Sequence, residues 1–170
     1  MNILCYRYGS IVEPDIIDGF KELGNQVSEI CLEIYNKNTT PLEGLTALKD
    51  ELMRHSYDFV FSINFYPFIA EVCNIFQIRY LCLTVDAPVL ELFSNSIQLP
   101  WNRIFLFDRA QYEDFHPLNP ECIFHLPLAG NPARYAPVIQ NATPDLIRKY
   151  SADISFVGSL YTEKCPYDRL

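Results

Sequence analysis

The stretch Tyr80-Leu81-Cys82-Leu83-Thr84-Val85-Asp86-Ala87-Pro88 carries the main indication of the fold. Its first four residues are apolar without interruption, and a carboxylate follows shortly afterwards. An uninterrupted apolar run of this length is typical of a strand covered on both faces, as in a parallel sheet. A polar residue after such a strand lies at its carboxyl end, where open α/β sheets bind ligands. The stretch therefore predicts a buried parallel strand that ends beside a candidate site.

Short apolar runs of the same kind recur along the chain, at residues 3–6, 59–61, 104–107 and 123–124. A further segment differs, because Ile30, Leu32 and Ile34 alternate with Cys31 and Glu33. Alternation is typical of a strand with one solvated face, so we expect this strand nearer the edge of the sheet. Together the runs predict about six strands.

The segments between these runs have the periodicity and end signals of helices. Pro14 suits a first helical position and Gly24 a left-handed stop, whereas Thr40-Pro41-Leu42-Glu43 and the pair Asp108 and Gln111 resemble capping boxes. The predicted helices span residues 14–23, 40–52, 67–76, 108–115 and 143–150. Alternating strands and helices predict an α/β fold: a Rossmann-like, mainly parallel sheet of about six strands with helices on both faces.

The last part of the chain departs from this rhythm. A Pro- and Gly-containing stretch, residues 127–137, precedes one predicted helix and suits a connection between two lobes. Residues 153–159, Asp-Ile-Ser-Phe-Val-Gly-Ser, then resemble a strand followed by a glycine turn. We therefore expect a Rossmann-like domain over residues 1–150, and the start of a truncated second domain or a linker over residues 151–170.

The composition excludes several classes of protein. The 170 residues include 13 Lys and Arg against 21 Asp and Glu, a net charge of −8, and 49% are hydrophobic. An acidic chain lacks the basic footprint that nucleic acids and anionic membranes require. No apolar run approaches the roughly 20 residues of a membrane span. The six cysteines contain no CxxC pair, so we expect reduced thiols and a cytoplasmic protein.

Several well-known catalytic motifs are absent from the sequence. The chain contains no GxGxxG, no phosphate-binding loop with a Gly-Lys pair and no GxSxG. One Cys and His pair, Cys122-x-x-His125, is closely spaced, but residues i and i+3 of a strand point to opposite faces. We therefore predict no metal site.

Polar residues at the predicted strand ends are the candidate binding residues, because ligands of open α/β sheets bind near the point where the strand order reverses. Three aromatic residues, Tyr8, Tyr66 and Trp101, could in addition form the floor of a cleft that binds a carbohydrate or another ring. The polar residues are Arg7, Tyr8, Gly9, Ser10 and Glu13 after the first strand, Asn64 after the third, Asp86 after the fourth, Asp108 and Arg109 after the fifth, and Gly130 and Asn131 after the sixth.

Most of these candidates also have a purely structural interpretation. Asp86 is placed to act as a general base or to orient a hydroxyl, but it could instead cap a helix that begins at Pro88. Arg7 could hold a phosphate or carboxylate, or pair with Asp86 or Glu13. Asn64 could bind a polar ligand or satisfy a turn.

Six segments, spread over essentially the whole chain, carry a family resemblance. They are residues 1–10, Asp58-Phe-Val-Phe-Ser-Ile-Asn64, Val85-Asp-Ala-Pro88, Trp101-Asn-Arg-Ile-Phe-Leu-Phe-Asp-Arg109, Leu126-Pro-Leu-Ala129 and Asp153-Ile-Ser-Phe-Val-Gly-Ser159. In order and spacing they resemble the N-terminal domain of bacterial CgeB-type, spore-maturation-like glycosyltransferases. The resemblance implies a GT-B architecture, in which two Rossmann-like lobes face each other across a cleft.

The same resemblance implies roles for the candidate residues. The N-terminal lobe faces the acceptor, and the C-terminal lobe holds a nucleotide-sugar with no need of a metal or another cofactor. Asp86 is then the first candidate for the catalytic carboxylate, and this chain alone is expected to be inactive. Facing the acceptor would be Arg7, Gly9, Ser10, Glu13, Asn64 and Arg109, and near the donor phosphates would be Gly158 and Ser159. The alternative is a non-catalytic α/β module that binds a ligand or another protein.

Overall fold

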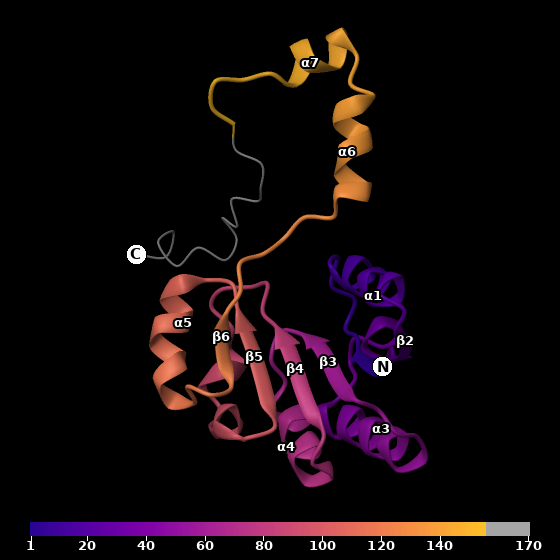
Figure 1. The fold of residues 1–170 in the computed structure, drawn as a ribbon, viewed down its shortest axis with the longest axis vertical. Helices are drawn as coiled ribbons and strands as arrows, with labels where there is room; N and C mark the ends of the chain where they lie inside the picture. The colour runs from indigo at the N-terminus through magenta and orange to yellow at the C-terminus, as the bar shows by residue number, and fades with distance from the viewer. Residues whose placement is uncertain (156–170) are drawn as a thin grey trace. The chain divides into compact units, whose positions relative to one another are not determined.

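The computed structural model of the chain describes residues 1–155, and its core is a sheet of six parallel strands in the order β2-β1-β3-β4-β5-β6 (Figure 1). This arrangement confirms the predicted α/β fold with a Rossmann-like parallel sheet. The strands are β1 (Asn2–Tyr6), β2 (Gln26–Ile30), β3 (Phe59–Ile63), β4 (Arg79–Leu83), β5 (Asn102–Leu106) and β6 (Ile123–His125).

Helices or 3-10 turns connect consecutive strands, and two of the helix starts have the predicted caps. The Thr40 and Glu43 capping box is present, and Asp108 Oδ1 accepts a hydrogen bond from Gln111 N at 2.8 Å. The helices are α1 (Glu13–Glu22), α2 (Leu32–Tyr35), α3 (Pro41–Arg54), α4 (Pro67–Phe76), α5 (Arg109–Phe115), α6 (Pro132–Gln140) and α7 (Pro144–Tyr150), with 3-10 turns η1 (Leu90–Phe93), η2 (Asn95–Gln98) and η3 (His116–Leu118).

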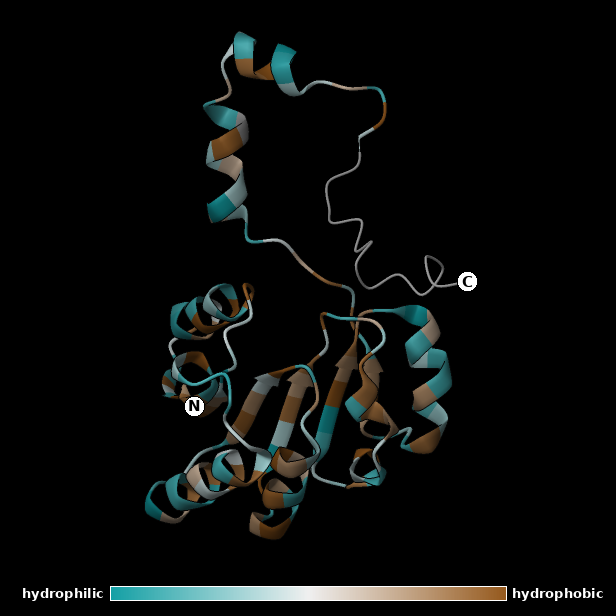
Figure 2. Ribbon diagram, turned by 180° about the vertical axis from the view of Figure 1, so that it is seen from behind, coloured by the Kyte–Doolittle hydropathy of each residue, from teal (hydrophilic) through white to brown (hydrophobic). Residues whose placement is uncertain are grey.

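Two separate cores lie on the two faces of the sheet. Leu4 and Val60 belong to a core that α3, α4 and α5 cover, whereas Ile3 and Phe61 pack against Ile17 of α1 on the opposite face. All five residues of β3 are buried, and Figure 2 shows mainly hydrophobic residues along the strands. Since each fully buried side chain of this size contributes about 1.5–3 kcal/mol, the central strands dominate the stability of the sheet.

The predicted strand around residues 30–34 is wrong in position, although β2 is an edge strand as expected. β2 pairs with β1 from Gln26 to Ile30, where β1 itself ends at Tyr6. Beyond this point the chain has no strand to pair with, so its N–H groups bond locally, as Asn36 N does to Leu32 O at 2.8 Å. The apolar alternation continues into the helical turn α2 instead.

The chain divides into two compact units, Met1–Ala129 and Gly130–Leu170. The predicted connection over residues 127–137 is partly wrong, because α6 begins within it and contains Pro137. Pro132 suits the first turn of the helix, whereas Pro137 in its interior removes one backbone hydrogen bond and crowds the carbonyl of Ala133. Of the predicted strand over residues 153–159, residues 153–155 form no strand, and Gly158 and Ser159 lie outside the described residues. Among the described helices, none is long and apolar enough to span a membrane.

Candidate binding cleft at the carboxyl ends of the central strands

The strand order reverses between β1 and β3, since the chain runs from β1 outward to β2 and then returns to the other side of β1. In open α/β sheets this reversal leaves a crevice at the carboxyl ends of the two strands. A cleft of about 730 Å³ lies there. Its lining includes four carboxylates, Glu33, Glu71, Asp86 and Glu91, and four aromatic rings, Tyr8, Phe65, Tyr66 and Phe68.

Asn64, directly after β3, joins the loops that border this cleft. Its Nδ2 donates to Asp86 Oδ2 at 2.7 Å and to the Tyr8 hydroxyl at 3.2 Å. Its Oδ1 accepts from Val85 N at 3.0 Å. Its φ of 57° lies in the left-handed region, which Asn tolerates better than most residues. The sequence therefore placed Asn64 and Asp86 at strand ends, and the adjacency of β3 and β4 brings them together.

A buried hydroxyl pair below Asn64 fixes the shape of this loop. Ser62 Oγ and the Tyr80 hydroxyl share a hydrogen bond of 2.6 Å. Ser62 Oγ also donates to Asn64 O at 2.7 Å, and Tyr66 N donates to the Tyr80 hydroxyl at 3.0 Å. Burial raises the pKa of Tyr80, so its phenol stays neutral. These bonds satisfy the backbone of the loop and leave the Asn64 side chain to the cleft.

Asp86 does not cap a helix, so that structural interpretation is wrong. The 3-10 turn η1 begins at Leu90, with Val89 in the N-cap position. Asp86 is exposed, and its Oδ2 accepts the bond from Asn64. Within the described part of the chain, no protein group donates to its Oδ1. One carboxylate oxygen is thus oriented by the protein while the other remains available.

Glu33 lies on the wall of the cleft, and the sequence prediction missed it. Its Oε1 accepts from the Tyr6 hydroxyl at 2.7 Å and its Oε2 from the Tyr66 hydroxyl at 3.4 Å. Burial first, and then the charge of Glu33, raise the pKa of Tyr66, so this phenol remains a neutral hydrogen-bond donor. Because residues 30–34 were predicted as a strand near the edge of the sheet, Glu33 was not counted among the residues at strand ends. Glu71 of α4 and Glu91 of η1 were missed as well, since neither follows a strand.

Two of the three aromatic candidates line the cleft. The ring centroids of Tyr8 and Tyr66 lie 6.3 Å apart, and that of Phe68 lies 5.5 Å from Tyr66. Trp101 instead precedes β5 and lines a smaller cleft of about 340 Å³ with Asp58 and Arg79, at the amino ends of the strands. Of the three aromatic candidates, the structure thus brings Tyr8 and Tyr66 into one cleft and leaves Trp101 outside it.

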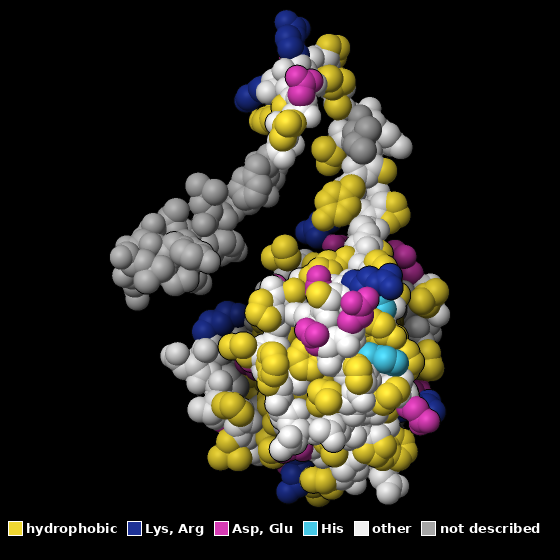
Figure 3. Space-filling model, turned by 90° about the vertical axis from the view of Figure 1, so that its left-hand side faces the viewer, with side chains coloured by type: hydrophobic (Ala, Val, Ile, Leu, Met, Phe, Trp, Pro, Cys, Tyr) yellow, Lys and Arg dark blue, Asp and Glu magenta, His cyan; other side chains and the backbone are white. Residues whose placement is uncertain are grey.

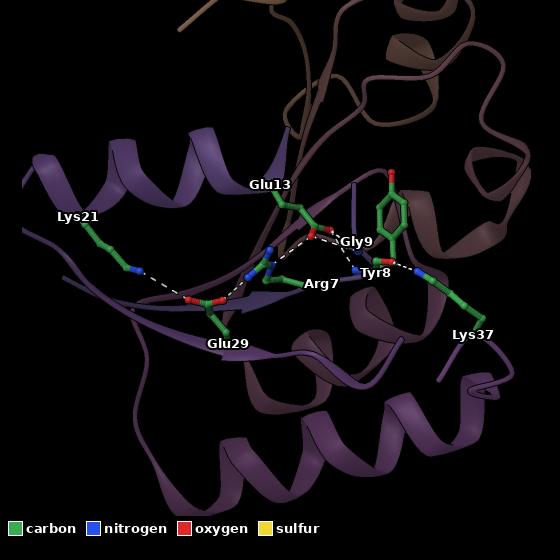
Figure 4. Close-up of polar contacts among 7 residues, drawn as sticks. All are labelled: Arg7, Tyr8, Gly9, Glu13, Lys21, Glu29 and Lys37. Atoms are coloured by element: carbon green, nitrogen blue, oxygen red, sulfur yellow. Dashed lines mark hydrogen bonds and ion pairs between the residues drawn. The ribbon is translucent and has the colours of Figure 1, made fainter. Parts of the chain in front are cut away.

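Arg7 and Glu13 bind each other rather than line the cleft (Figure 4). Glu13 is only 2% exposed and accepts from Arg7 Nε at 3.1 Å, Tyr8 N at 3.0 Å and Gly9 N at 3.2 Å. Arg7 also donates to Glu29 Oε2 at 2.5 Å. Burial lowers the pKa of Arg7, but its hydrogen bonds to Glu29 and Glu13 outweigh this effect and the net shift is upward.

The remaining residues of this loop are held by further contacts of the same kind. Gly9 has a φ of 95°, which only glycine adopts readily, and Ser10 O accepts from Glu13 N at 3.2 Å. Lys37 Nζ donates to Tyr8 O at 2.7 Å. Of the predicted binding residues after β1, none but Tyr8 contributes to the lining of the cleft. The polar groups of the loop serve mainly to hold Tyr8 in position.

Arg109 lies on the surface of α5, away from the cleft lining. Its Nε is 2.9 Å from Glu113 Oε1, and its side chain is 80% exposed. Figure 3 looks onto the side of the first unit where α5 lies, and basic and acidic side chains are neighbours on it.

The closely spaced pair Cys122 and His125 lies at β6. Cys122, just before this strand, is buried, and His125, its last residue, is exposed. The described residues contain no group of three potential metal ligands.

The lining groups define what the cleft can bind. Carboxylates accept hydrogen bonds and neutral phenols donate them, whereas no Lys or Arg belongs to the described lining. Such a surface suits hydroxyl groups and repels phosphates. The cleft is therefore better matched to a polyol than to a nucleotide.

No family model matches this chain, and no curated protein matches it either. Among solved structures, its fold is similar to that of the chemotaxis protein CheY4 of Vibrio cholerae. The TM-score is 0.41 and the sequence identity 12%, with 82% of this chain and 95% of that chain covered. These comparisons assign no activity.

Proposed function

We propose that the first unit is the acceptor-side domain of a glycosyltransferase and that the cleft binds a hydroxyl-bearing acceptor. The observation that carries this proposal is the combination of carboxylates, phenols and aromatic rings in one cleft at the strand-order reversal. Sugar hydroxyls donate to carboxylates and accept from phenols, and the apolar faces of sugar rings pack on aromatic rings. The resemblance to the CgeB-type N-terminal domain supports the same role.

The charge of the cleft favours the acceptor over the donor. Four carboxylates line it, and no Lys or Arg is among the described lining residues. A nucleotide-sugar carries a diphosphate, which carboxylates repel and which helix N-termini or basic side chains normally bind. A donor site must therefore be supplied by another domain, which agrees with the two-lobed architecture that the resemblance implies.

In this proposal Asp86 is the general base of the transfer. Its free carboxylate oxygen takes the proton of the acceptor hydroxyl while that hydroxyl oxygen bonds to the anomeric carbon of the donor. The bond between the anomeric carbon and the phosphate oxygen breaks, and the nucleotide leaves with the electron pair. The hydrogen bond from Asn64 orients the carboxylate for this step.

Titration of the chain with sugars tests the acceptor site. We expect glucose, galactose and mannose to shift the amide NMR signals of Tyr8, Asn64 and Tyr66, and a uridine diphosphate sugar to leave them unchanged. The matched control Arg109→Ala, in which a charge outside the cleft is removed, should titrate like the parent. A cleft that binds the nucleotide-sugar, or no sugar at all, would contradict the proposal.

The catalytic role of Asp86 needs a rate measurement in a protein that also carries a donor domain. There we expect Asp86→Asn to lower kcat by at least about 100-fold with little change in acceptor affinity. An unchanged rate with sugar binding retained would show that Asp86 is not the general base of the transfer.

We also propose a cytoplasmic location. The described cysteines, Cys5, Cys31, Cys73, Cys82 and Cys122, are all free thiols. Burial raises the pKa of Cys5 to about 12, so this thiol is unreactive at neutral pH. Free thiols are typical of reducing compartments.

A further inference from the structure

Three of the four carboxylates of the cleft accept hydrogen bonds from neutral groups, and none of the four has a cationic partner in the part of the chain that the structure describes. Glu33 accepts from two tyrosines, Glu71 Oε1 from Ser96 Oγ at 2.7 Å, and Asp86 from Asn64. None of these donors is charged. The cleft therefore gathers several negative charges around one volume of about 730 Å³.

The cations on neighbouring elements are engaged elsewhere. Arg7 is held by Glu13 and Glu29, and Lys37 Nζ donates to the backbone carbonyl of Tyr8. Neither contributes a lining group. The negative charge of the cleft is thus left for a ligand to neutralise.

The aromatic walls favour the same kind of ligand. Tyr8, Tyr66 and Phe68 form a row of rings with successive centroid distances of 6.3 and 5.5 Å. Aromatic faces attract cations as well as the C–H faces of sugar rings. Burial and nearby carboxylates raise the pKa values of Tyr8 and Tyr66, so both phenols are neutral and add no competing charge.

We propose that the acceptor is an amino sugar, which the cleft recognises by its protonated amine as well as by its hydroxyls. This inference rests on the proposed acceptor function and narrows its substrate class. The ammonium group lies among the carboxylates, and the sugar ring packs on the row of aromatic rings. Neutral sugars keep the hydroxyl and ring contacts but lack the ammonium group, so they bind more weakly.

Paired titrations of the 170-residue chain test this inference. The probes are glucosamine, galactosamine and mannosamine at pH 7, each against its neutral parent sugar and its N-acetyl derivative, which has no charge. We expect at least one amino sugar to bind about tenfold more tightly than its parent, because two or three partly exposed ion pairs together are worth about one factor of ten. The preference should shrink as salt rises from 0.05 to 0.5 M.

Charge-neutral variants locate the preference. Glu71→Gln/Glu91→Gln keeps the size of two exposed lining side chains, and we expect it to reduce the amino-sugar preference to about onefold to threefold. The matched control Glu22→Gln/Glu121→Gln removes the same charge from exposed positions outside the lining and should keep the preference.

Two outcomes would overturn the inference in distinguishable ways. If amino sugars and neutral sugars bind the cleft equally well, the amine requirement is wrong and the acceptor proposal stands. If no sugar of either class shifts the amide signals of Tyr8, Asn64 or Tyr66, both are wrong. Loss of the preference in the control pair as well would show a general charge effect and overturn the role of the cleft carboxylates.

Discussion

The loops that follow the two central strands use their polar groups in opposite ways. After β1, the buried carboxylate of Glu13 collects hydrogen bonds from Arg7 and from the backbone of Tyr8 and Gly9. After β3, the Asn64 side chain reaches away from its own loop to Asp86 and Tyr8. The first loop is closed on itself, and the second opens onto the cleft.

The difference lies in what satisfies the backbone of each loop. After β3, the buried hydroxyls of Ser62 and Tyr80 bond to Asn64 O and Tyr66 N, so the Asn64 side chain is not needed for that purpose. After β1, the Glu13 side chain itself receives the backbone N–H groups. A polar side chain at these strand ends thus reaches the cleft only where other groups satisfy the backbone of its loop.

Loss of its carboxylate should destabilise the protein more in the closed loop after β1 than the loss of Asn64 does in the loop after β3. Glu13→Ala leaves Arg7 with one carboxylate partner and two backbone N–H groups without an acceptor, so we expect a loss of about 3 kcal/mol in the free energy of unfolding. Urea unfolding measures it. The matched control Glu113→Ala removes one partner of an exposed ion pair and should cost no more than about 0.5 kcal/mol. Similar losses in both variants would contradict the contrast between the loops.

The open loop should lose binding more than stability. Asn64→Gly retains the φ of 57° and removes the bonds to Asp86, Tyr8 and Val85, so we expect a loss of about 1–2 kcal/mol in stability and about tenfold in sugar affinity. Gln77→Gly is the control, because Gln77 has a φ of 55° at the end of α4 and does not line the cleft. It should be neutral or stabilising by up to about 1 kcal/mol. Equal changes in stability and sugar affinity in the two variants would mean that the hydrogen bonds of the Asn64 side chain contribute to neither.

Local signals predicted most of the fold, because apolar runs and helix caps act over a few residues. Thr40 and Asp108 cap helices as expected, and the uninterrupted run of β3 is buried on both faces. The error near Ile30 arose where strand pairing decides the structure. β2 ends because its partner β1 ends, and the sequence of β2 itself contains no signal for that end.

The candidate site was predictable only in part, for a related reason. Asn64 and Asp86 follow strands, and the sequence marks strand ends. Glu33, Glu71 and Glu91 reach the cleft from helical elements, and their positions depend on how those elements pack against the sheet. The Arg7 and Glu13 pair was one of two interpretations left open, and only the geometry of the loop selects it.

Two helical glycines provide a pair of opposite predictions. A Cβ added at Gly44 of α3 would lie 2.6 Å from the Tyr6 hydroxyl and 3.0 Å from the ring of Phe68, whereas one added at Gly19 of α1 meets nothing within 4 Å. Alanine gains up to about 1 kcal/mol in a helix. We therefore expect Gly19→Ala to stabilise by about that amount. Gly44→Ala should instead destabilise by about 1 kcal/mol net, because Tyr6 is buried and bonded to Glu33. Thermal unfolding of both variants measures the difference, and stabilisation by both would show that the space around Gly44 is not tight.

The smallest effect is expected where a carboxylate makes the same kind of backbone bond as Glu13 but at the surface. Glu43 accepts from Thr40 N at 2.7 Å and from Thr40 Oγ1 at 2.9 Å, and these two bonds lower the pKa of Glu43 below its ordinary value of 4.5. Because the folded state holds the charged form, the contribution of Glu43 is present above the unfolded pKa and is lost as the pH falls through the folded pKa. Glu43→Gln removes the charge but keeps an accepting oxygen, so its cost should be greatest at pH 7 and should decline below about pH 4. Urea unfolding at pH 7, 5 and 3 measures this cost, and a difference that stays constant over that range would show that the charge at the start of α3 contributes nothing.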